Sequence, residues 1–308
     1  MAGRIAPEPE TLEPRAAFLS DDAIEILAFA AQSMTDGHAV ALVTLVEIRG
    51  GAARAIGAQM AVCADGRYCG FVSGGCTEAA VAAEAVIALQ KGLDRNLCLG
   101  EGSPFFDIVL PCGGGITLAI HVLRDTAVLH RALTALQRRI PVCLRYHAGA
   151  QALDLEAGEG KAGWDGDAFV RAYRPRERLV LGGTGMEASA VAQIASASGY
   201  EVLLLERGQV PTDDQLDRDT AVALLFHDVD RELVLLERVL ASRAFYIGAL
   251  GSRRTHGTRC AALRQRGYCD ADLARIKAPI GIFDKARDAR TLALSIVADI
   301  AQARLHGL

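Results

Sequence analysis

The second half of the sequence alternates short apolar runs with helix-like segments, and this alternation restricts the fold more than any other feature. The apolar runs, which have the length and composition of buried strands, span residues 178–182, 201–206, 220–225 and 244–249. The segments with helical character span residues 186–198, 229–241, 252–267 and 286–305. Strands that alternate with helices form parallel sheets with right-handed crossovers. The pattern therefore predicts an α/β domain over residues 175–308.

The first strand of this half runs into a glycine-rich turn that opens a helix. The turn reads Gly183-Thr184-Gly185-Met186-Glu187-Ala188, which has the form G-x-G-x-x-A, and Glu206 ends the next strand. Such glycines let a phosphate approach the helix N-terminus, and the acid can bind a ribose diol. We therefore expect a Rossmann-like domain with a nucleotide site at Gly183, Gly185 and Glu206. The alternative is the same fold with glycines that serve only helix–strand packing.

A second loop of this half combines glycine with two arginines. Gly251-Ser252-Arg253-Arg254 follows the strand at 244–249 and opens a helix, for which Ser252 is a suitable N-cap. Guanidinium groups bind anions such as phosphate, so the loop is a candidate cofactor site. His227 ends the preceding strand, and ligands bind at the carboxyl ends of such strands. The alternatives are a solvated helix start and a structural histidine.

The first half of the chain combines a hairpin with helices and predicts a mixed α+β domain over residues 21–174. Asp65-Gly66 is a strong hairpin signal between two apolar runs. We expect strands at residues 39–48, 58–64, 67–72, 115–123 and 141–147, and helices at 21–34, 77–91 and 126–139. Residues 148–168 have the composition of a loop. A flexible tail is expected at 1–20, and a charged, proline-broken segment marks the domain boundary near residue 174.

Two glycine-rich loops of the first half carry a cysteine. Ser73-Gly74-Gly75-Cys76 stands between a strand and a helix, where free backbone N–H groups can bind an anion and favour a thiolate. Cys112-Gly113-Gly114-Gly115 precedes another strand. Thiolates favour soft metals. We therefore expect these loops to bind a ligand, with Cys76 and Cys112 contacting its metal or sulfur; the alternative is two buried thiols in glycine turns.

Charge and hydrophobic patterning exclude several classes of partner. The 33 basic and 37 acidic residues give a net charge of −4, whereas nucleic-acid-binding domains usually have a basic excess. Apolar runs such as residues 221–226 are far shorter than the roughly 20 residues that cross a membrane. The first twenty residues lack the core of a signal peptide, and the eight cysteines include no Cys-x-x-Cys pair. We expect a cytoplasmic protein with no nucleic-acid and no membrane partner.

Several short motifs occur in a fixed order from about residue 21 onward. In the first half they are Val43-Thr44-Leu45-Val46, Gly57-Ala58-Gln59-Met60, Asp65-Gly66, Ser73-Gly74-Gly75-Cys76-Thr77-Glu78 and Cys112-Gly113-Gly114-Gly115. In the second half they are Tyr246-Ile247-Gly248-Ala249-Leu250-Gly251-Ser252-Arg253-Arg254-Thr255-His256 and Ala278-Pro279-Ile280-Gly281. Together they resemble the XdhC/CoxI family, the xanthine dehydrogenase accessory factors. This chain has Gly50-Gly51 where that family usually has Gly-Ser.

The resemblance implies a molybdenum-cofactor chaperone rather than a turnover enzyme. Such a protein binds the molybdenum cofactor (molybdopterin), protects it, assists its sulfuration with a cysteine desulfurase, and inserts it into a molybdenum hydroxylase apoenzyme of xanthine dehydrogenase type. The glycine loops would suit the phosphate of this anionic pterin, and Cys76 and Cys112 would suit its metal end. The sequence leaves a homodimer open.

Two other functions remain open. One is an NAD(P)-dependent oxidoreductase that uses Gly183, Gly185 and Glu206, and the other is a sensor that binds a nucleotide without chemistry. The sequence contains no G-x-x-x-x-G-K-[ST], H-E-x-x-H or G-x-S-x-G motif. Their absence favours a protein that holds a ligand over the common kinds of catalysis.

Overall fold

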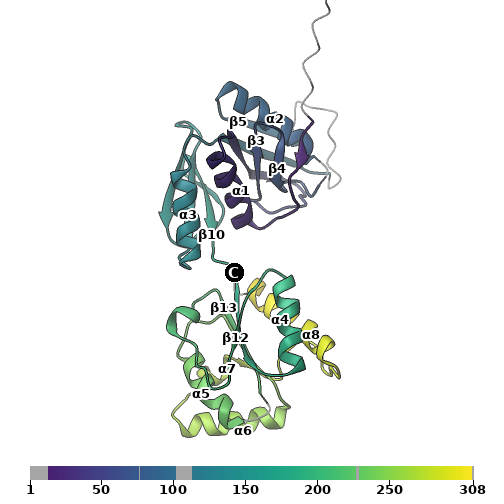
Figure 1. Ribbon diagram of the computed structural model, residues 1–308, viewed down its shortest axis with the longest axis vertical. Coiled ribbons are helices and arrows are strands. Elements are labelled where there is room, and N and C mark those ends of the chain that lie inside the picture. Colours follow the sequence, from purple (N-terminus) through teal and green to yellow (C-terminus); the bar gives the residue numbers. More distant parts are fainter. Residues whose placement is uncertain (1–12, 76, 102–112, 227–228, 307–308) are drawn as a thin grey trace, which may run out of the picture. The chain divides into compact units, whose positions relative to one another are not determined.

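The computed structural model describes residues 13–75, 77–101, 113–226 and 229–306 (Figure 1). The chain divides into two compact units, Met1–Pro175 and Arg176–Leu308, which we call unit 1 and unit 2. No helix within the described ranges has the length and hydrophobicity needed to cross a membrane. The cysteines in those ranges are free thiols, and they are Cys63, Cys69, Cys98, Cys143, Cys260 and Cys269.

Unit 1 contains a six-stranded sheet with the strand order β1-β4-β3-β2-β6-β5. Its strands are β1 (Arg15–Ala16), β2 (Val40–Arg49), β3 (Gln59–Cys63), β4 (Arg67–Gly70), β5 (Arg95–Gly100) and β6 (Gly115–Val122). Neighbouring strands are antiparallel except for β1 and β4. Arg15 and Ala16, which the sequence placed in a flexible tail, instead pair with β4, and β5 was not expected.

Helices cover both faces of this sheet. α2 (Glu78–Lys91) packs on one face, where Val81 lies in a hydrophobic cluster with Leu118 of β6. α1 (Ala23–Thr35) and α3 (Ala127–Gln137) pack on the other face together with a second sheet. Because both faces are covered, β2 is buried along most of its length. The three expected helices are present, with slightly shifted ends.

The second sheet of unit 1 is antiparallel, with the order β8-β7-β10-β9. Its strands are β7 (Val142–His147), β8 (Ala152–Ala157), β9 (Gly163–Asp165) and β10 (Ala168–Tyr173). The prediction of a loop at 148–168 is therefore wrong, since β8 and β9 lie within these residues. Most of β8 is at least partly exposed and carries Asp154 and Glu156 on its exposed side, which hides the strand in a hydrophobicity pattern.

Unit 2 is a doubly covered parallel sheet with the order β12-β11-β13-β14-β15. Its strands are β11 (Arg178–Gly183), β12 (Glu201–Leu205), β13 (Thr220–Leu225), β14 (Tyr246–Ala249) and β15 (Ile276–Lys277). This confirms the predicted α/β fold class, in which the chain has a domain with a Rossmann-like parallel sheet and a mixed α+β domain. The strand order reverses between β11 and β13, and ligands of open α/β sheets bind at such a switch point.

The helices of unit 2 lie on both faces of its sheet (Figure 1). α4 (Met186–Ala197) and α8 (Ala289–His306) pack together on one face. α5 (Val229–Leu240), α6 (Arg253–Gln265) and α7 (Asp270–Ala274) cover the other. A short 3-10 helix, η1 (Asp213–Gln215), lies in the connection between β12 and β13.

Candidate functional site

Three glycine-rich loops meet at one edge of the six-stranded sheet in unit 1. They are residues 50–53 after β2, residues 73–75 after β4, and residues 113–115 where β6 begins. A Cβ atom placed on Gly114 would overlap the carbonyl oxygen of Gly51, and one on Gly74 would lie 3.1 Å from the Cβ of Ala53. The loop at 50–53 therefore packs against both of the other loops, and its contact with Gly114 is backbone to backbone. This brings the predicted Gly74, Gly75, Gly113 and Gly114 together and adds the loop at 50–53, which sequence reasoning had not placed there.

The loop after β4 is closed by Glu78, from the first turn of α2. Oε1 of Glu78 accepts hydrogen bonds from the backbone N–H of Val72 at 3.0 Å and of Ser73 at 2.8 Å. Oε2 accepts from the Ser73 hydroxyl at 2.8 Å and from Thr77 N–H at 3.2 Å. The side chain is almost fully buried, with 2% exposure. Three backbone donors near the predicted anion site are thus already bound to a carboxylate.

Electrostatics keep this carboxylate ionised. Burial acts to raise the pKa of Glu78, but the hydrogen bonds from Ser73 and Val72 outweigh it and hold that pKa below its usual value. Glu78 is a functional candidate that sequence reasoning missed. The available signal was an acid in the first helical turn after a glycine loop, where a carboxylate is favoured.

The glycines at this edge divide into packed and open positions. Gly75 and Gly113 have positive φ angles of 104° and 70°, and a Cβ on either would meet no atom of the described residues within 4 Å. Both are exposed, so bare backbone faces solvent there. Gly114, in contrast, is required by packing against Gly51. Cys76 and Cys112 lie outside the described residues.

A polar cluster that sequence reasoning missed lies beside the same edge. Nη1 of Arg49 donates to Glu47 Oε2 and to Thr117 Oγ1, both at 2.8 Å, and Thr117 Oγ1 donates to Glu47 at 2.7 Å. Sγ of Cys98 lies 3.7 Å from Thr117 Oγ1. Nε of Arg49 also donates to the carbonyl oxygen of Glu101 at 3.2 Å, and this hydrogen bond connects the end of β2 with the residue that follows β5.

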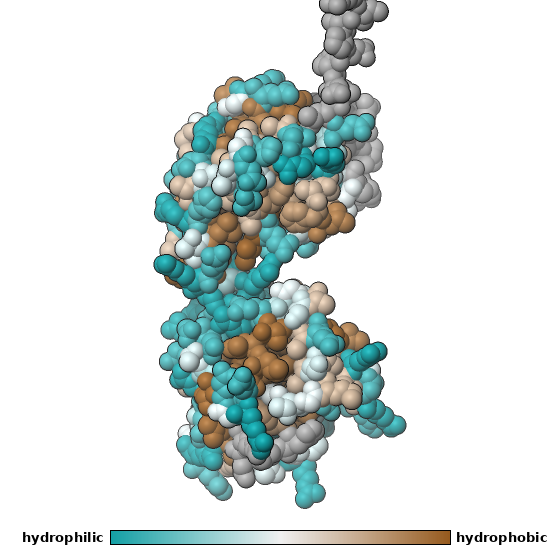
Figure 2. Space-filling model, viewed as in Figure 1, coloured by the Kyte–Doolittle hydropathy of each residue, from teal (hydrophilic) through white to brown (hydrophobic). Residues whose placement is uncertain are grey.

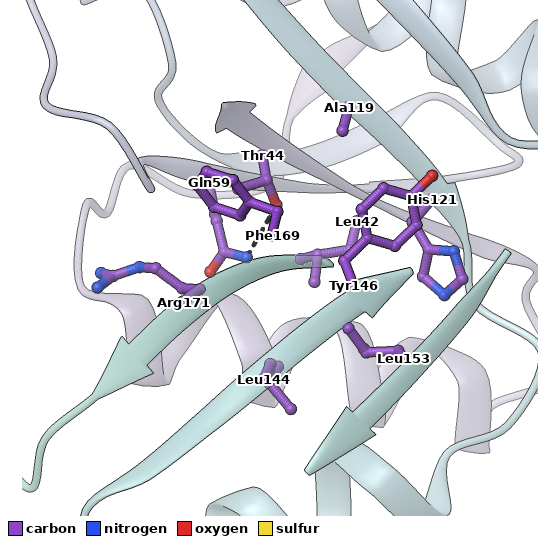
Figure 3. A pocket seen from close by; sticks show the side chains of 10 residues that line it. All are labelled: Leu42, Thr44, Gln59, Ala119, His121, Leu144, Tyr146, Leu153, Phe169 and Arg171. Carbon is purple, nitrogen blue, oxygen red and sulfur yellow. Dashed lines mark hydrogen bonds between the residues drawn. The ribbon is translucent and has the colours of Figure 1, made fainter. Parts of the chain in front are cut away.

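A small cavity lies between the two sheets of unit 1 (Figure 3). Gln59 Nε2 donates to Thr44 Oγ1 at 3.0 Å on its wall, and the hydroxyl of Tyr173 donates to Gln59 Oε1 at 2.5 Å. The cavity volume of about 20 Å³ is enough for roughly one water molecule. It is therefore too small for a pterin or a nucleotide.

The glycine turn of unit 2 opens into a larger cavity, of about 520 Å³. Its lining includes Gly183, Gly185 and Glu206, so the structure brings the three residues predicted for a nucleotide to one place. The other lining residues are Thr184, Ala188, Ser189, Ala192, Gln193, Leu204 and Leu205. Glu206 lies at the carboxyl end of β12 and is exposed.

The arginine loop of unit 2 lies at the end of β14 and does not line this cavity. Ser252 caps α6 by accepting a hydrogen bond from Thr255 N–H at 3.2 Å, as expected. Gly251 adopts φ 127° and packs against Thr255. Arg253 and Arg254 are exposed. His227 lies outside the described residues.

No group of three or more Cys, His, Asp or Glu side chains within the described ranges could hold a metal ion. A protein metal site of that kind is therefore not visible in this part of the chain.

Comparisons with known proteins agree with both halves of the fold. Residues 33–99 match the XdhC and CoxI family, and residues 179–300 match the XdhC Rossmann domain. The chain is 50% identical over 294 residues to the molybdenum cofactor insertion chaperone PaoD of Escherichia coli K12, covering 96% of this chain and 92% of PaoD.

Two more distant relatives also match along most of their length. A Bacillus subtilis 168 protein described as a probable xanthine dehydrogenase component is 23% identical, covering 88% of this chain and 95% of that protein. The crystal structure of a protein described as a xanthine dehydrogenase from Bacillus halodurans has the same fold, with a TM-score of 0.70 and 20% identity over 92% of this chain and 96% of that one. The chain belongs to the XdhC and CoxI family.

Proposed function

We propose that this protein is a chaperone that binds the molybdenum cofactor as cargo, protects it, and inserts it into a molybdenum hydroxylase of xanthine dehydrogenase type. The near full-length identity of 50% to a molybdenum cofactor insertion chaperone supports the general role. The placement of the cofactor rests on one observation, that three glycine-rich loops meet at one edge of the six-stranded sheet of unit 1. The cofactor would lie against this edge.

The residues at this edge fit a flat pterin with a sulfur-bound metal. Gly75 and Gly113 present backbone that no side chain of the described residues covers, and the pterin ring would lie against it. Because Glu78 already binds the N–H groups of Val72, Ser73 and Thr77, the cofactor's phosphate would be repelled from that part of the loop. Cys76 and Cys112 would supply sulfur near the metal end.

The finer steps of the function follow from the same assignment. We expect a cysteine desulfurase to assist the replacement of an oxo ligand of the bound cofactor by sulfur. We expect both the desulfurase and the hydroxylase apoenzyme to bind unit 1 near the three loops. A homodimer and a cytoplasmic location stay predictions.

Cofactor loading tests the proposal directly. Purified protein is mixed with molybdopterin, separated by gel filtration, and assayed for retained pterin and metal. The wild type should retain both, and Cys76→Ala with Cys112→Ala should retain less. Cys269→Ala, which removes an exposed thiol of unit 2, is the matched control. Failure of the wild type to retain pterin would contradict the chaperone function, whereas full retention by the double variant would contradict only the thiol assignment.

A second candidate function is nucleotide binding in unit 2. It is favoured by the cavity of about 520 Å³ at Gly183, Gly185 and Glu206. Nucleotide binding combined with turnover would indicate the oxidoreductase, and binding without turnover or pterin retention would indicate the sensor. Titration of the protein with NAD, followed by an assay for hydride transfer, distinguishes these outcomes.

A further inference from the structure

The small residues of the glycine turn at 183–188 in unit 2 are explained by different structural features. A Cβ on Gly183 would lie 2.8 Å from the carbonyl oxygen of Leu225, so this position is fixed by the close approach of β11 and β13. Ala188 is buried with 2% exposure against the sheet. Gly185 has φ 99° and ψ −163°, and the nearest atom to its Cβ would be Glu187 Oε2 at 3.7 Å. Of these three positions, only Gly185 has no close packing contact that explains the small residue.

The opposite end of the cavity carries an unpaired carboxylate. The turn after β12 is held by the backbone of Glu206, whose N–H donates to Gln209 Oε1 at 2.9 Å and whose carbonyl accepts from Gln209 N–H at 3.0 Å. The carboxylate of Glu206 itself has no hydrogen-bond or ion-pair partner among the residues that the structure describes. It is therefore an available acceptor at the rim of the cavity.

The rest of the wall is apolar or neutral. Leu204 is 51% exposed although it belongs to a strand of the sheet, and Figure 2 shows hydrophobic side chains gathered over β12. Glu206 is the sole ionisable residue among the described residues that line the cavity, and no Lys or Arg is among them. Such a wall suits a heterocyclic base with a neutral diol better than a second phosphate.

We propose that this cavity binds a nucleotide with an unphosphorylated ribose, whose two hydroxyls donate to Glu206, and rejects a nucleotide with a 2′-phosphate. This inference rests on nucleotide binding as the second candidate function and names its ligand class. The base would pack on Leu204 and Ala192, and the 5′-phosphate would approach the turn at Gly185. A 2′-phosphate would face the Glu206 carboxylate, and no Lys or Arg among the described lining residues would offset the repulsion.

Calorimetric titration of the full-length protein with NAD and with NADP tests the ligand class. NAD should bind at least about tenfold more tightly than NADP, the ratio expected when one charged hydrogen-bonding interaction is lost or opposed. Glu206→Gln should weaken NAD binding about tenfold and narrow the difference from NADP. Glu201→Gln, at the other end of the same strand, is the matched control and should change neither affinity.

A pair of glycine variants tests the position of the ligand. Gly185→Ala should abolish NAD binding, whereas Gly199→Ala should not, although both glycines have positive φ and no atom close to the added methyl group. Equal affinities for NAD and NADP, or no effect of Glu206→Gln, would overturn the ribose specificity while nucleotide binding itself survives. Binding of neither nucleotide would overturn the nucleotide site altogether, and pterin retention, measured on the same samples, would still decide the chaperone function separately.

Discussion

The carboxylate of Glu78 lies 2.8 Å from the backbone nitrogen of Ser73 and 2.8 Å from its hydroxyl oxygen, so one buried side chain holds the start of the loop that leads to Cys76. A loop of two consecutive glycines would otherwise be costly to order, because glycine loses more conformational freedom on folding than any other residue. The hydrogen bonds to Glu78 fix the start of the loop, whereas Gly74 and Gly75 remain exposed.

Replacing this carboxylate with an amide should loosen the loop. Glu78→Gln turns an NH₂ group toward donors that now bind an oxygen, and we expect the free energy of unfolding of unit 1 to fall by about 1–3 kcal/mol. Fluorescence of Trp164, the single tryptophan, reports urea unfolding of unit 1. Glu187→Gln, which changes an acid in the first turn of α4, is the control. An unchanged transition for Glu78→Gln would show that the hydrogen bonds contribute little.

A buried aspartate should make unit 1 sensitive to acid. Asp94 Oδ2 lies 2.6 Å from His121 Nδ1 and accepts a hydrogen bond from the Tyr146 hydroxyl at 3.0 Å. Burial acts to raise the pKa of Asp94, but hydrogen bonds from His121, Val122 and Tyr146 lower it below its usual value. A carboxyl group with a depressed folded pKa stabilises the fold above its unfolded pKa, near about 3.9, and loses this contribution as pH falls through the folded pKa.

Asp94→Asn should therefore change the pH dependence as well as the stability. Near neutral pH the variant should be less stable by about 3 kcal/mol, because the negative charge is lost and the partners of one of the two oxygens face an NH₂ group instead of an acceptor. Between about pH 5 and about pH 2 the wild type should lose stability more steeply than the variant. Urea midpoints from Trp164 fluorescence at several pH values measure both effects. Parallel curves for the two proteins would rule out Asp94 as the titrating group.

The sequence predicted unit 2 better than unit 1 for a physical reason. Strands buried on both faces, such as Thr220–Leu225, are continuous apolar runs and are visible in the sequence. The strand Ala152–Ala157 is mostly exposed and carries Asp154 and Glu156, so its pattern resembles a loop. The turn at Gly183 was recognisable because all of its parts are local.

The edge formed by the three loops of unit 1 could be predicted only in part. The cysteine loops were visible as glycine runs, but the contact of residues 113–115 with the loop at 50–53 depends on the antiparallel register that places Arg49 opposite Gly115. The role of Glu78 was equally hidden, because its partners become known only when the loop is folded over the helix start. Pairing register and loop conformation are tertiary properties that short motifs do not encode.

Substitutions at the neighbouring Gly113 and Gly114 distinguish the effect of close packing at this edge from the effect of a positive φ angle. Gly114→Ala should strongly destabilise unit 1 and reduce pterin retention, because the added methyl group overlaps the backbone of Gly51. The methyl group of Gly113→Ala would meet no described atom, so the variant should cost only about 1–2 kcal/mol for its positive φ. Urea unfolding and cofactor loading of both variants measure the difference. Equal effects would mean that the loops at 50–53 and 113–115 do not pack as described.

The buried ion pair of unit 2 should behave as a single unit. Arg259 is 0% exposed and Glu232 is 1% exposed, and Nε of Arg259 donates to Glu232 Oε2 at 2.9 Å. Nη2 of Arg259 also donates to the carbonyl of Leu250 at 2.8 Å, which fixes the loop before α6. Arg259→Met leaves a buried carboxylate without its cation and should lower the free energy of unfolding of unit 2 by about 3–5 kcal/mol.

The double variant Arg259→Met with Glu232→Met should recover most of this loss, because apolar side chains of similar volume can replace a buried ion pair at little cost. Far-UV circular dichroism follows both units, and the transition seen by Trp164 fluorescence should stay unchanged, since the tryptophan belongs to unit 1. A small part of the loss should persist because the carbonyl of Leu250 still lacks its donor. A double variant less stable than Arg259→Met alone would contradict this, because it would show that Glu232 stabilises unit 2 through contacts other than its pairing with Arg259.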